Sequence, residues 1–87
     1  TLGPVTLPNK PSRPLRIVLA EDNRDAADTM RMLLEMFGDE VWLAETGHDA
    51  VEAVRQYAPD VLLCDIGLPG MSGYEVARIL RQDARFA

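Results

Sequence analysis

Three acidic side chains are the residues of this sequence best able to do chemistry together. Glu21 and Asp22 directly follow a short apolar run, and Asp65 interrupts the end of a second run, residues 61–66. If both runs are parallel strands, their carboxyl ends open into the crevice where such sheets bind ligands. At a separation of about 5 Å and an effective dielectric of about 20, each pair of carboxylates would cost about 3 kcal/mol. We therefore expect a cation among them, and oxygen ligands of this kind favour Mg²⁺.

Each acid also has a simpler explanation. Glu21 and Asp22 could complement the dipole of a following helix, and Asp65 could cap the turn that comes after it. Their combination at one sheet edge favours a site instead. A carboxylate is a competent nucleophile toward a phosphoryl group, and a metal ion would remove the repulsion between the two. Pro69 and Gly70 fix a loop in which backbone N–H groups can face the phosphoryl oxygens.

Composition describes one globular domain or part of one. The 87 residues are 47% hydrophobic and 26% charged. No apolar run approaches the ~20 residues of a membrane span, and no secretory signal pattern is present, so we expect a cytoplasmic protein. The net charge of −5 argues against a nucleic-acid-binding surface. The single cysteine, Cys64, excludes an intrachain disulfide and is expected to fill space in the core.

Hydrophobic patterning predicts strands that alternate with helices. Residues 1–14 contain four prolines and no period, which is typical of a linker or tail, and residues 15–87 form the expected domain. Strands are predicted at 15–20, 40–44 and 61–66, each followed by an amphipathic helical pattern. This βαβαβα order predicts an α/β fold with a parallel sheet and right-handed crossovers.

Local signals bound the helices. Asn23 is a good N-cap, Gly38 ends the first helix, and Pro59 stops the second. The first helix is expected to bury one stripe of residues: Ala26, Ala27, Met30, Leu33, Leu34 and Phe37. The third is expected to turn three residues inward: Tyr74, Ala77 and Leu80.

Two single residues have modest interpretations. The only histidine, His48, begins the second helix without a second histidine or a cysteine to pair with, so we interpret it as a solvated surface residue. Trp42 is expected at the edge of the sheet or covering one of its faces.

Residues 19–23 (LAEDN) and 65–75 (DIGLPGMSGYE) together resemble the receiver domain of two-component response regulators. The resemblance extends from about Leu15 to the end of the chain. It implies a flavodoxin-like, doubly wound parallel sheet with strand order 2-1-3. It also implies that Asp65 is the phosphoacceptor, that Asp22, Asp65 and the Gly67 backbone carbonyl bind Mg²⁺ directly, and that Glu21 holds the ion through water.

The match to the family is incomplete. Receivers have two further βα units, which carry a Ser or Thr and a Lys that contact the phosphoryl group. The only lysine here, Lys10, precedes the first predicted strand. The chain therefore resembles the first three-fifths of a receiver, as an expressed fragment or a truncated form. Residues 23–29 and the proline-containing tail also resemble receivers fused behind histidine kinases.

We predict a phosphoacceptor domain, not an enzyme in the usual sense, that takes a phosphoryl group from a phosphohistidine on a sensor kinase or histidine phosphotransfer domain. One alternative is a non-phosphorylated, receiver-like interaction module. Another is a Mg²⁺-dependent phosphohydrolase, which is disfavoured because its usual second acid, two residues after the nucleophile, is replaced by Gly67.

The missing units affect the predicted edge of the sheet. Without a fourth strand, the outer N–H and C=O groups of strand 61–66 have no partner, and an apolar open edge pairs readily with another chain. A domain of about seventy residues is also marginally stable. We therefore expect a dimer or an oligomer that exchanges elements, with no nucleic-acid or membrane contact from this part of the protein.

Overall fold

The computed structural model describes residues 2–6, 14–65, 68 and 70–82, with only the backbone path for residues 2–6. Three of its strands are parallel: β2 (Arg16–Ala20), β3 (Glu40–Ala44) and β4 (Val61–Asp65). β2 lies between the other two, so that Val18 is opposite Trp42 on one side and Leu62 on the other. Counted among the three parallel strands alone, the predicted order 2-1-3 is confirmed and corresponds to β3-β2-β4. Ile66, the expected last residue of the third parallel strand, is outside the described residues.

A fourth strand comes from the amino-terminal segment. β1 (Leu2–Thr6) runs antiparallel to β4 along its outer edge, with Leu2 opposite Asp65. The prediction that this edge has no partner is therefore wrong. Four prolines in the segment suggested irregular structure, but a proline such as Pro4 is compatible with an edge strand, where one side needs no N–H donor. The division into a linker, 1–14, and a domain, 15–87, stays a prediction.

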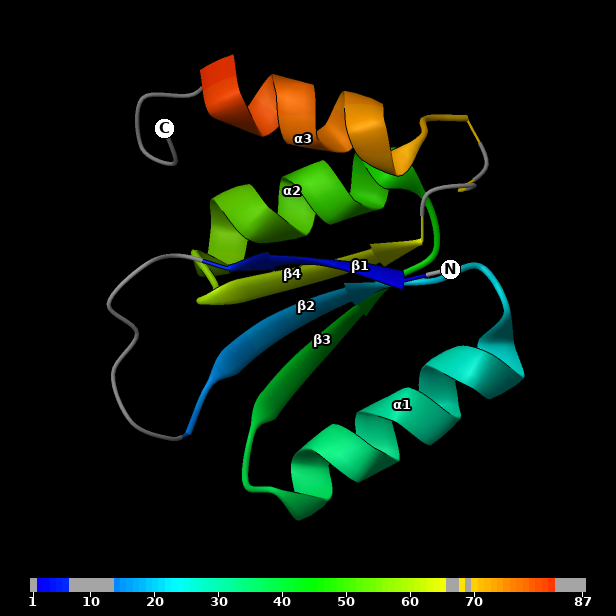
Figure 1. The fold of residues 1–87 in the computed structure, drawn as a ribbon, viewed down its shortest axis with the longest axis vertical. Helices are drawn as coiled ribbons and strands as arrows, with labels where there is room; N and C mark the ends of the chain where they lie inside the picture. The colour runs from blue at the N-terminus through cyan, green and yellow to red at the C-terminus, as the bar shows by residue number, and fades with distance from the viewer. Residues whose placement is uncertain (1, 7–13, 66–67, 69, 83–87) are drawn as a thin grey trace.

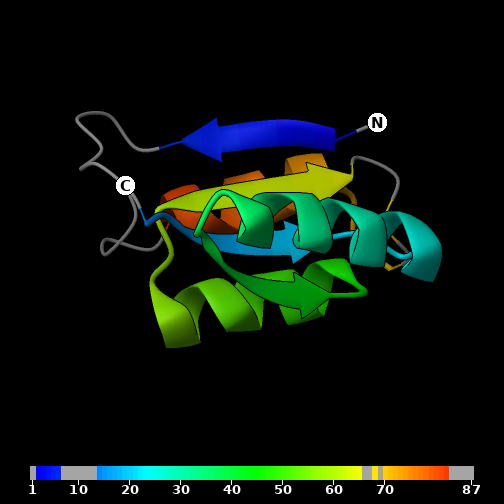
Figure 2. The same ribbon diagram turned by 90° about the horizontal axis from the view of Figure 1, so that it is seen from below.

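Helices cover both faces of the sheet, but unequally. α1 (Arg24–Met36) lies on one face, and α2 (Gly47–Tyr57) and α3 (Gly73–Gln82) lie side by side on the other (Figure 1). The view from below shows β1 extending the sheet beyond β4 (Figure 2). Because helices cover both faces, the side chains that the parallel strands point to either face can be buried. Accordingly, residues 17–20 of the central strand are all buried.

Each helix begins at a polar side chain that accepts a hydrogen bond from the backbone of its first turn, as capping requires. The three caps are Asn23 to Ala26 N at 3.0 Å, Thr46 to Asp49 N at 3.1 Å, and Ser72 to Glu75 N at 3.3 Å. α1 ends before Gly38, whose φ of 89° only glycine adopts without strain. The predicted ends of this helix are thus reproduced by the structure.

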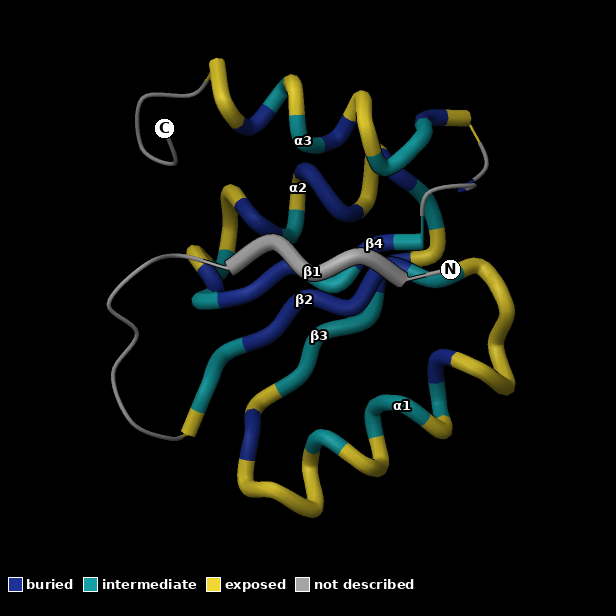
Figure 3. Tube along the Cα trace, in the orientation of Figure 1, coloured by how far each residue is buried: buried dark blue, intermediate teal, exposed yellow. Residues whose placement is uncertain are grey.

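The buried stripes of α1 and α3 differ from prediction. Of the six residues expected on the stripe of α1, only Ala27 is buried, whereas Leu33 and Phe37 are exposed. Figure 3 shows α1 coloured mostly as intermediate and exposed. The reason is that α1 packs against the sheet without a neighbouring helix in the described part of the chain. On α3 the inward residues are Val76 and Leu80, one turn apart, and Tyr74 in the first turn is 73% exposed.

The main core lies between the sheet and the α2–α3 pair. It consists of strand residues, helix residues and two residues of the connection after β4: Val18, Ala20, Ala44, Ala50, Val51, Val54, Leu62, Cys64, Leu68, Met71, Val76 and Leu80. Trp42, on the edge strand β3, stacks on Tyr57 with ring centroids 4.4 Å apart, as its predicted edge position allows. None of the described helices is both long enough and apolar enough to cross a membrane.

Two buried or half-buried acids fix the start of β2. Asp39 accepts a hydrogen bond from the Leu15 N–H at 3.0 Å, and Asp60 accepts one from the Arg16 N–H at 2.9 Å. Both acids come directly before neighbouring strands. They satisfy backbone donors at the amino-terminal edge of the sheet, opposite the edge where the other acids gather.

Candidate functional site

The carboxyl ends of β2 and β4 bring three predicted site residues together. Ala20 pairs with Cys64 in the sheet, so the residues that follow each strand leave the same edge side by side. One carboxylate oxygen from each of Glu21, Asp22 and Asp65 lies within 4.8 Å of the other two. Glu21 and Asp65 are partly buried and Asp22 is exposed. The fourth predicted ligand, the Gly67 carbonyl, lies outside the described residues, and the roles of all four stay predictions.

Glu21 is the most constrained of the three acids. Its N–H donates to the Ala44 carbonyl at 2.9 Å, which ties the end of β2 to the end of β3. Burial raises the pKa of its carboxyl, and a hydrogen bond with Asp65 and the charges of Asp65 and Asp22 raise this pKa further. One of its oxygens, Oε2, is buried without a hydrogen-bond partner among the described residues. Such an oxygen is costly unless something positive satisfies it.

These features fit a hard divalent cation. Three carboxylates converge, burial and then the neighbouring acids raise the pKa of Glu21, and one buried oxygen of Glu21 has no donor among the described residues. Mg²⁺ binds through one or two carboxylates and keeps several waters, which leaves room for a phosphoryl oxygen. The donor set therefore suits Mg²⁺ better than a metal that prefers nitrogen or sulfur.

The connection after Asp65 is held by the core. Leu68 and Met71 are both buried in the cluster under α2 and α3. Between them Gly70 has a φ of 76°, a conformation that side chains rarely adopt. Pro69 and Gly70 predict a fixed loop here, and Pro69 lies outside the described residues. The burial of Met71 was not predicted, because nothing in the local pattern shows which side of a loop faces the core.

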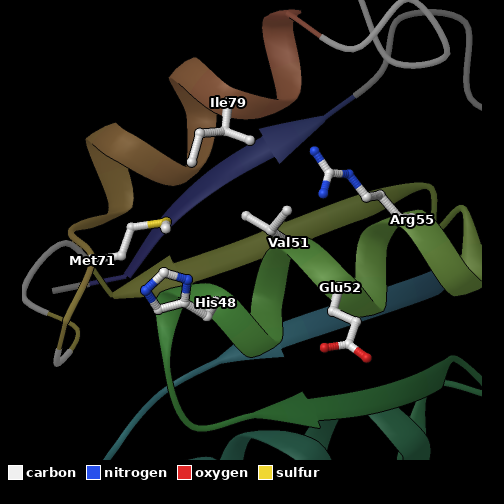
Figure 4. A pocket seen from close by; sticks show the side chains of 6 residues that line it. All are labelled: His48, Val51, Glu52, Arg55, Met71 and Ile79. Carbon is white, nitrogen blue, oxygen red and sulfur yellow. The ribbon is translucent and has the colours of Figure 1, made fainter.

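Cys64 is buried in the core and His48 lies at the surface, as predicted. Cys64 is 5% exposed, and burial raises the pKa of its thiol to about 11, with the Asp65 charge as a second cause. It is therefore neither a thiolate ligand nor a nucleophile at neutral pH. His48 is exposed at one end of an open groove of about 600 Å³ between α2 and α3 (Figure 4).

That groove is distinct from the acidic cluster. Its lining comes from α2, from α3 and from the connection after β4: His48, Val51, Glu52, Arg55, Met71 and Ile79. Glu52 and Arg55 bring opposite charges to its α2 side, and Val51, Met71 and Ile79 are apolar. Met71 is thus shared between the groove and the loop that follows the acidic site.

The three parallel strands form a doubly wound sheet, and three acids that could hold a cation lie at its carboxyl edge. This combination defines a class of domain suited to phosphoryl chemistry. Comparison with known proteins then identifies the family. The family model of the response regulator receiver domain matches residues 17–86, and the chain belongs to that family. The resemblance in the sequence is confirmed, and with it the phosphoacceptor role of this domain in two-component signal transduction.

Relatives support the same assignment. The chain is 36% identical over 74 residues to the virulence sensor protein BvgS of Bordetella pertussis, covering 85% of this chain and 6% of that protein. It is 39% identical over 69 residues to protein PilH of Pseudomonas aeruginosa, covering 79% of this chain and 57% of PilH. In both comparisons it spans less than two-thirds of the relative's length.

Solved structures agree with the fold. A putative response regulator from Chloroflexus aurantiacus superposes with a TM-score of 0.80 at 30% identity, covering 85% of this chain and 61% of that one. The amino-terminal domain of a response regulator receiver protein from Methanoculleus marisnigri gives a TM-score of 0.78 at 26% identity, covering 83% and 58%.

Proposed function

We propose that Asp65 accepts a phosphoryl group from a phosphohistidine on a sensor kinase or histidine phosphotransfer domain. The observation that supports this best is the convergence of Glu21, Asp22 and Asp65 within 4.8 Å at the carboxyl edge of the sheet. An acid that only caps a turn at a strand end would not require two further carboxylates beside it. The family supplies the class of reaction, and the geometry supplies the reason to select Asp65, which ends the strand beside Glu21 and Asp22.

In the proposed transfer, an Asp65 carboxylate oxygen forms a bond to phosphorus while the phosphorus–nitrogen bond to the donor histidine breaks. The electron pair of that bond stays on the imidazole nitrogen, and the products are an aspartyl-phosphate and a free histidine. Mg²⁺, when bound, supplies positive charge between the carboxylate and the phosphoryl oxygens. Asp22, Asp65 and the Gly67 carbonyl would hold the ion directly, and Glu21 would hold it through water.

The half-buried position of Asp65 supports its selection as nucleophile. It ends β4, which is paired on both sides, so its backbone is fixed by the sheet. Asp22 is exposed and lies in the connection between β2 and α1. A carboxylate on a rigid strand is better suited to an in-line attack, whose rate depends on positioning, than one on a connection.

Partners and compartment follow from this role. We propose that the donor is a histidine kinase or a histidine phosphotransfer domain, either separate or fused to this domain, in the cytoplasm. One relative, BvgS, is a sensor protein, which supports a donor of this class. The self-association predicted from the sequence stays a prediction, although β1 now occupies the edge that motivated it.

The phosphoacceptor is tested in the complete protein with Asp65→Asn. The amide has nearly the size of the carboxylate but is a poor nucleophile, and it removes one charge from a repelling cluster. We expect no acid-labile phosphate after incubation with a small phosphodonor and Mg²⁺, with an unchanged fold by circular dichroism. Asp25→Asn, on the exposed surface of α1, is the matched control and should retain the phosphate. Phosphate that persists in Asp65→Asn would remove Asp65 from this role.

The metal site is tested by thermal unfolding with Mg²⁺ or a chelator. A ligand that binds only the folded state stabilises it, by about 2.7 kcal/mol at one hundred times its dissociation constant. We expect Asp22→Ala to reduce this stabilisation more than Glu21→Ala, because direct contact should exceed water-mediated contact. Equal melting temperatures with Mg²⁺ and with chelator would exclude the site.

A further inference from the structure

The start of α2 and the loop after the acidic site are in unusually close contact. Gly47 is the first residue of α2 and is buried. A Cβ atom at this position would lie 2.5 Å from the Met71 Cβ, 2.6 Å from the Met71 carbonyl oxygen and 3.0 Å from the Met71 Cγ. Contacts below 3.0 Å are essentially never made by real Cβ atoms. Only glycine therefore allows Met71 to lie where it does.

The contact cannot be relieved by a rotation of the Met71 side chain. Two of the three atoms, the Cβ and the carbonyl oxygen, are fixed to the backbone, and Met71 itself is 8% exposed and packed in the core. Restoring an ordinary contact of 3.4 Å from 2.5 Å requires a shift of about 1 Å in a well-packed region, where small volume changes are costly. The backbone at Met71, or the start of α2, would have to move.

Met71 belongs to the connection that carries the site. It is six residues after Asp65 and directly before Ser72, which caps α3. Leu68 anchors the same connection in the core. Among the described residues, this connection is thus anchored at Leu68 in the core and at Met71 against Gly47. Resting on the proposed function above, we propose that Gly47 is a positioning residue for phosphoryl transfer, because it fixes the place of Met71 in the connection that follows the phosphoacceptor.

The consequence for the reaction is geometric. Phosphoryl transfer depends on alignment of the attacking oxygen, and a misplacement of about 1 Å can reduce a rate about one hundredfold. Gly47 touches neither substrate nor metal, so its effect must pass through the loop. It should change the transfer rate without changing the identity of the phosphoacceptor.

The test compares Gly47→Ala with Gly38→Ala in the complete protein. Gly38 has open space around a would-be Cβ but a φ of 89°, so alanine there costs stability through backbone strain, far from the site. With a small phosphodonor and saturating Mg²⁺, corrected for the folded fraction, we expect Gly47→Ala to be phosphorylated about ten- to one-hundredfold more slowly than wild type. Gly38→Ala should keep the wild-type rate.

A second readout does not depend on activity. In the metal-free protein, Gly47→Ala should shift the backbone amide resonances of Leu68 and Asp65, whereas Gly38→Ala should not. If Gly47→Ala does not fold, Met71→Gly is added, because it removes two of the three close contacts and leaves only the one to the Met71 carbonyl oxygen. The double variant is then compared with Met71→Gly alone, which has the same loss of core packing. Slower phosphorylation and a shifted Leu68 amide in the double variant would support the proposal, and equal rates with unshifted amides would overturn it.

The outcomes separate this inference from the proposed function. If wild type and Gly38→Ala take up phosphate and Gly47→Ala does so equally fast with unshifted amides, only the role of Gly47 is rejected. If wild type takes up none, the proposed function fails and the positioning role fails with it.

Discussion

The two faces of the sheet are built on the same strands but are buried to different extents. Residues Val18 and Ala20 of β2 belong to the core under α2 and α3, while Ile17 and Leu19, which alternate with them, point to the face of α1. All four are buried. The helices above them differ, because α2 and α3 shield each other and α1 has no described neighbour.

The exposed apolar side chains show this difference. Of the five large hydrophobic residues that are exposed in the described part, four lie on α1 or directly after it: Met32, Leu33, Met36 and Phe37. An amphipathic pattern records what a helix is able to bury, and the number of packed neighbours decides how much it does bury. The amphipathic stripe of α1 therefore predicts a helix correctly while overstating its burial.

The largest expected effect comes from matched leucine truncations on the two faces. Leu80 on α3 is 8% exposed and Leu33 on α1 is 48% exposed. Leu80→Ala should lower the free energy of unfolding by about 2–5 kcal/mol, since it leaves a cavity in a packed core. Leu33→Ala should cost less than about 1 kcal/mol, because its side chain is already half in water. Urea denaturation measures both, and equal shifts of the midpoint would contradict the comparison.

A smaller effect concerns self-association, for which two surfaces compete. Removing residues 1–6 uncovers the outer edge of β4, and an open edge recruits strands from other chains. We expect this deletion to tighten dimerisation about tenfold or more, equivalent to about 1.4 kcal/mol or more. Sedimentation at micromolar concentration checks it.

Met36→Lys is the comparison variant for that experiment. Met36 is 81% exposed in the last turn of α1, which has no basic residue, so a lysine there also complements the helix dipole. If the apolar surface of α1 drives association, this variant weakens it and the deletion of residues 1–6 has no effect. If the edge of β4 drives association, the deletion of residues 1–6 tightens it and Met36→Lys has no effect.

Sequence patterns predicted the parallel strands, the two ends of α1 at Asn23 and Gly38, and the meeting of three acids, because each depends on local signals or on the rule that parallel strands end at one edge. They did not predict β1, since a five-residue strand with a proline is stabilised by its partner β4 and not by its own composition. The Gly47–Met71 contact was missed for a related reason. Residues 24 positions apart meet only once both helices are placed, and a glycine at a helix start has a local explanation that hides the contact.

Asp39 and Asp60 show the same limit at the opposite edge. Each was an unremarked acid before a strand, yet each accepts a hydrogen bond from the start of β2. Glu21 and Asp22 follow a strand and Asp65 ends one, whereas Asp39 and Asp60 each precede a strand. In a parallel sheet this order along the chain decides the edge at which an acid lies, but it does not show which backbone donor the acid meets there.

The smallest effect on stability is expected from a variant with one thiol on each face of the sheet. It reports most directly how well the helices shield each face from solvent. Cys64 lies under α2 and α3, 5% exposed, with its pKa raised to about 11, and Leu33→Cys adds a thiol on the exposed side of α1. At pH 8 the thiolate fraction alone should make Cys64 about two hundredfold less reactive than an exposed cysteine with a pKa of about 8.5, and burial should slow it further. Peptide mass spectrometry after alkylation reads both thiols in the same molecule. The pKa of Cys64 is about 11 in the folded state and about 9 in the unfolded chain, so between these pH values the thiol ionises first in the unfolded chain. Its contribution to the free energy of unfolding therefore falls as the pH rises from about 9 toward 11. Comparable alkylation of the two thiols at pH 8 would mean that the face under α2 and α3 opens as readily as the face under α1.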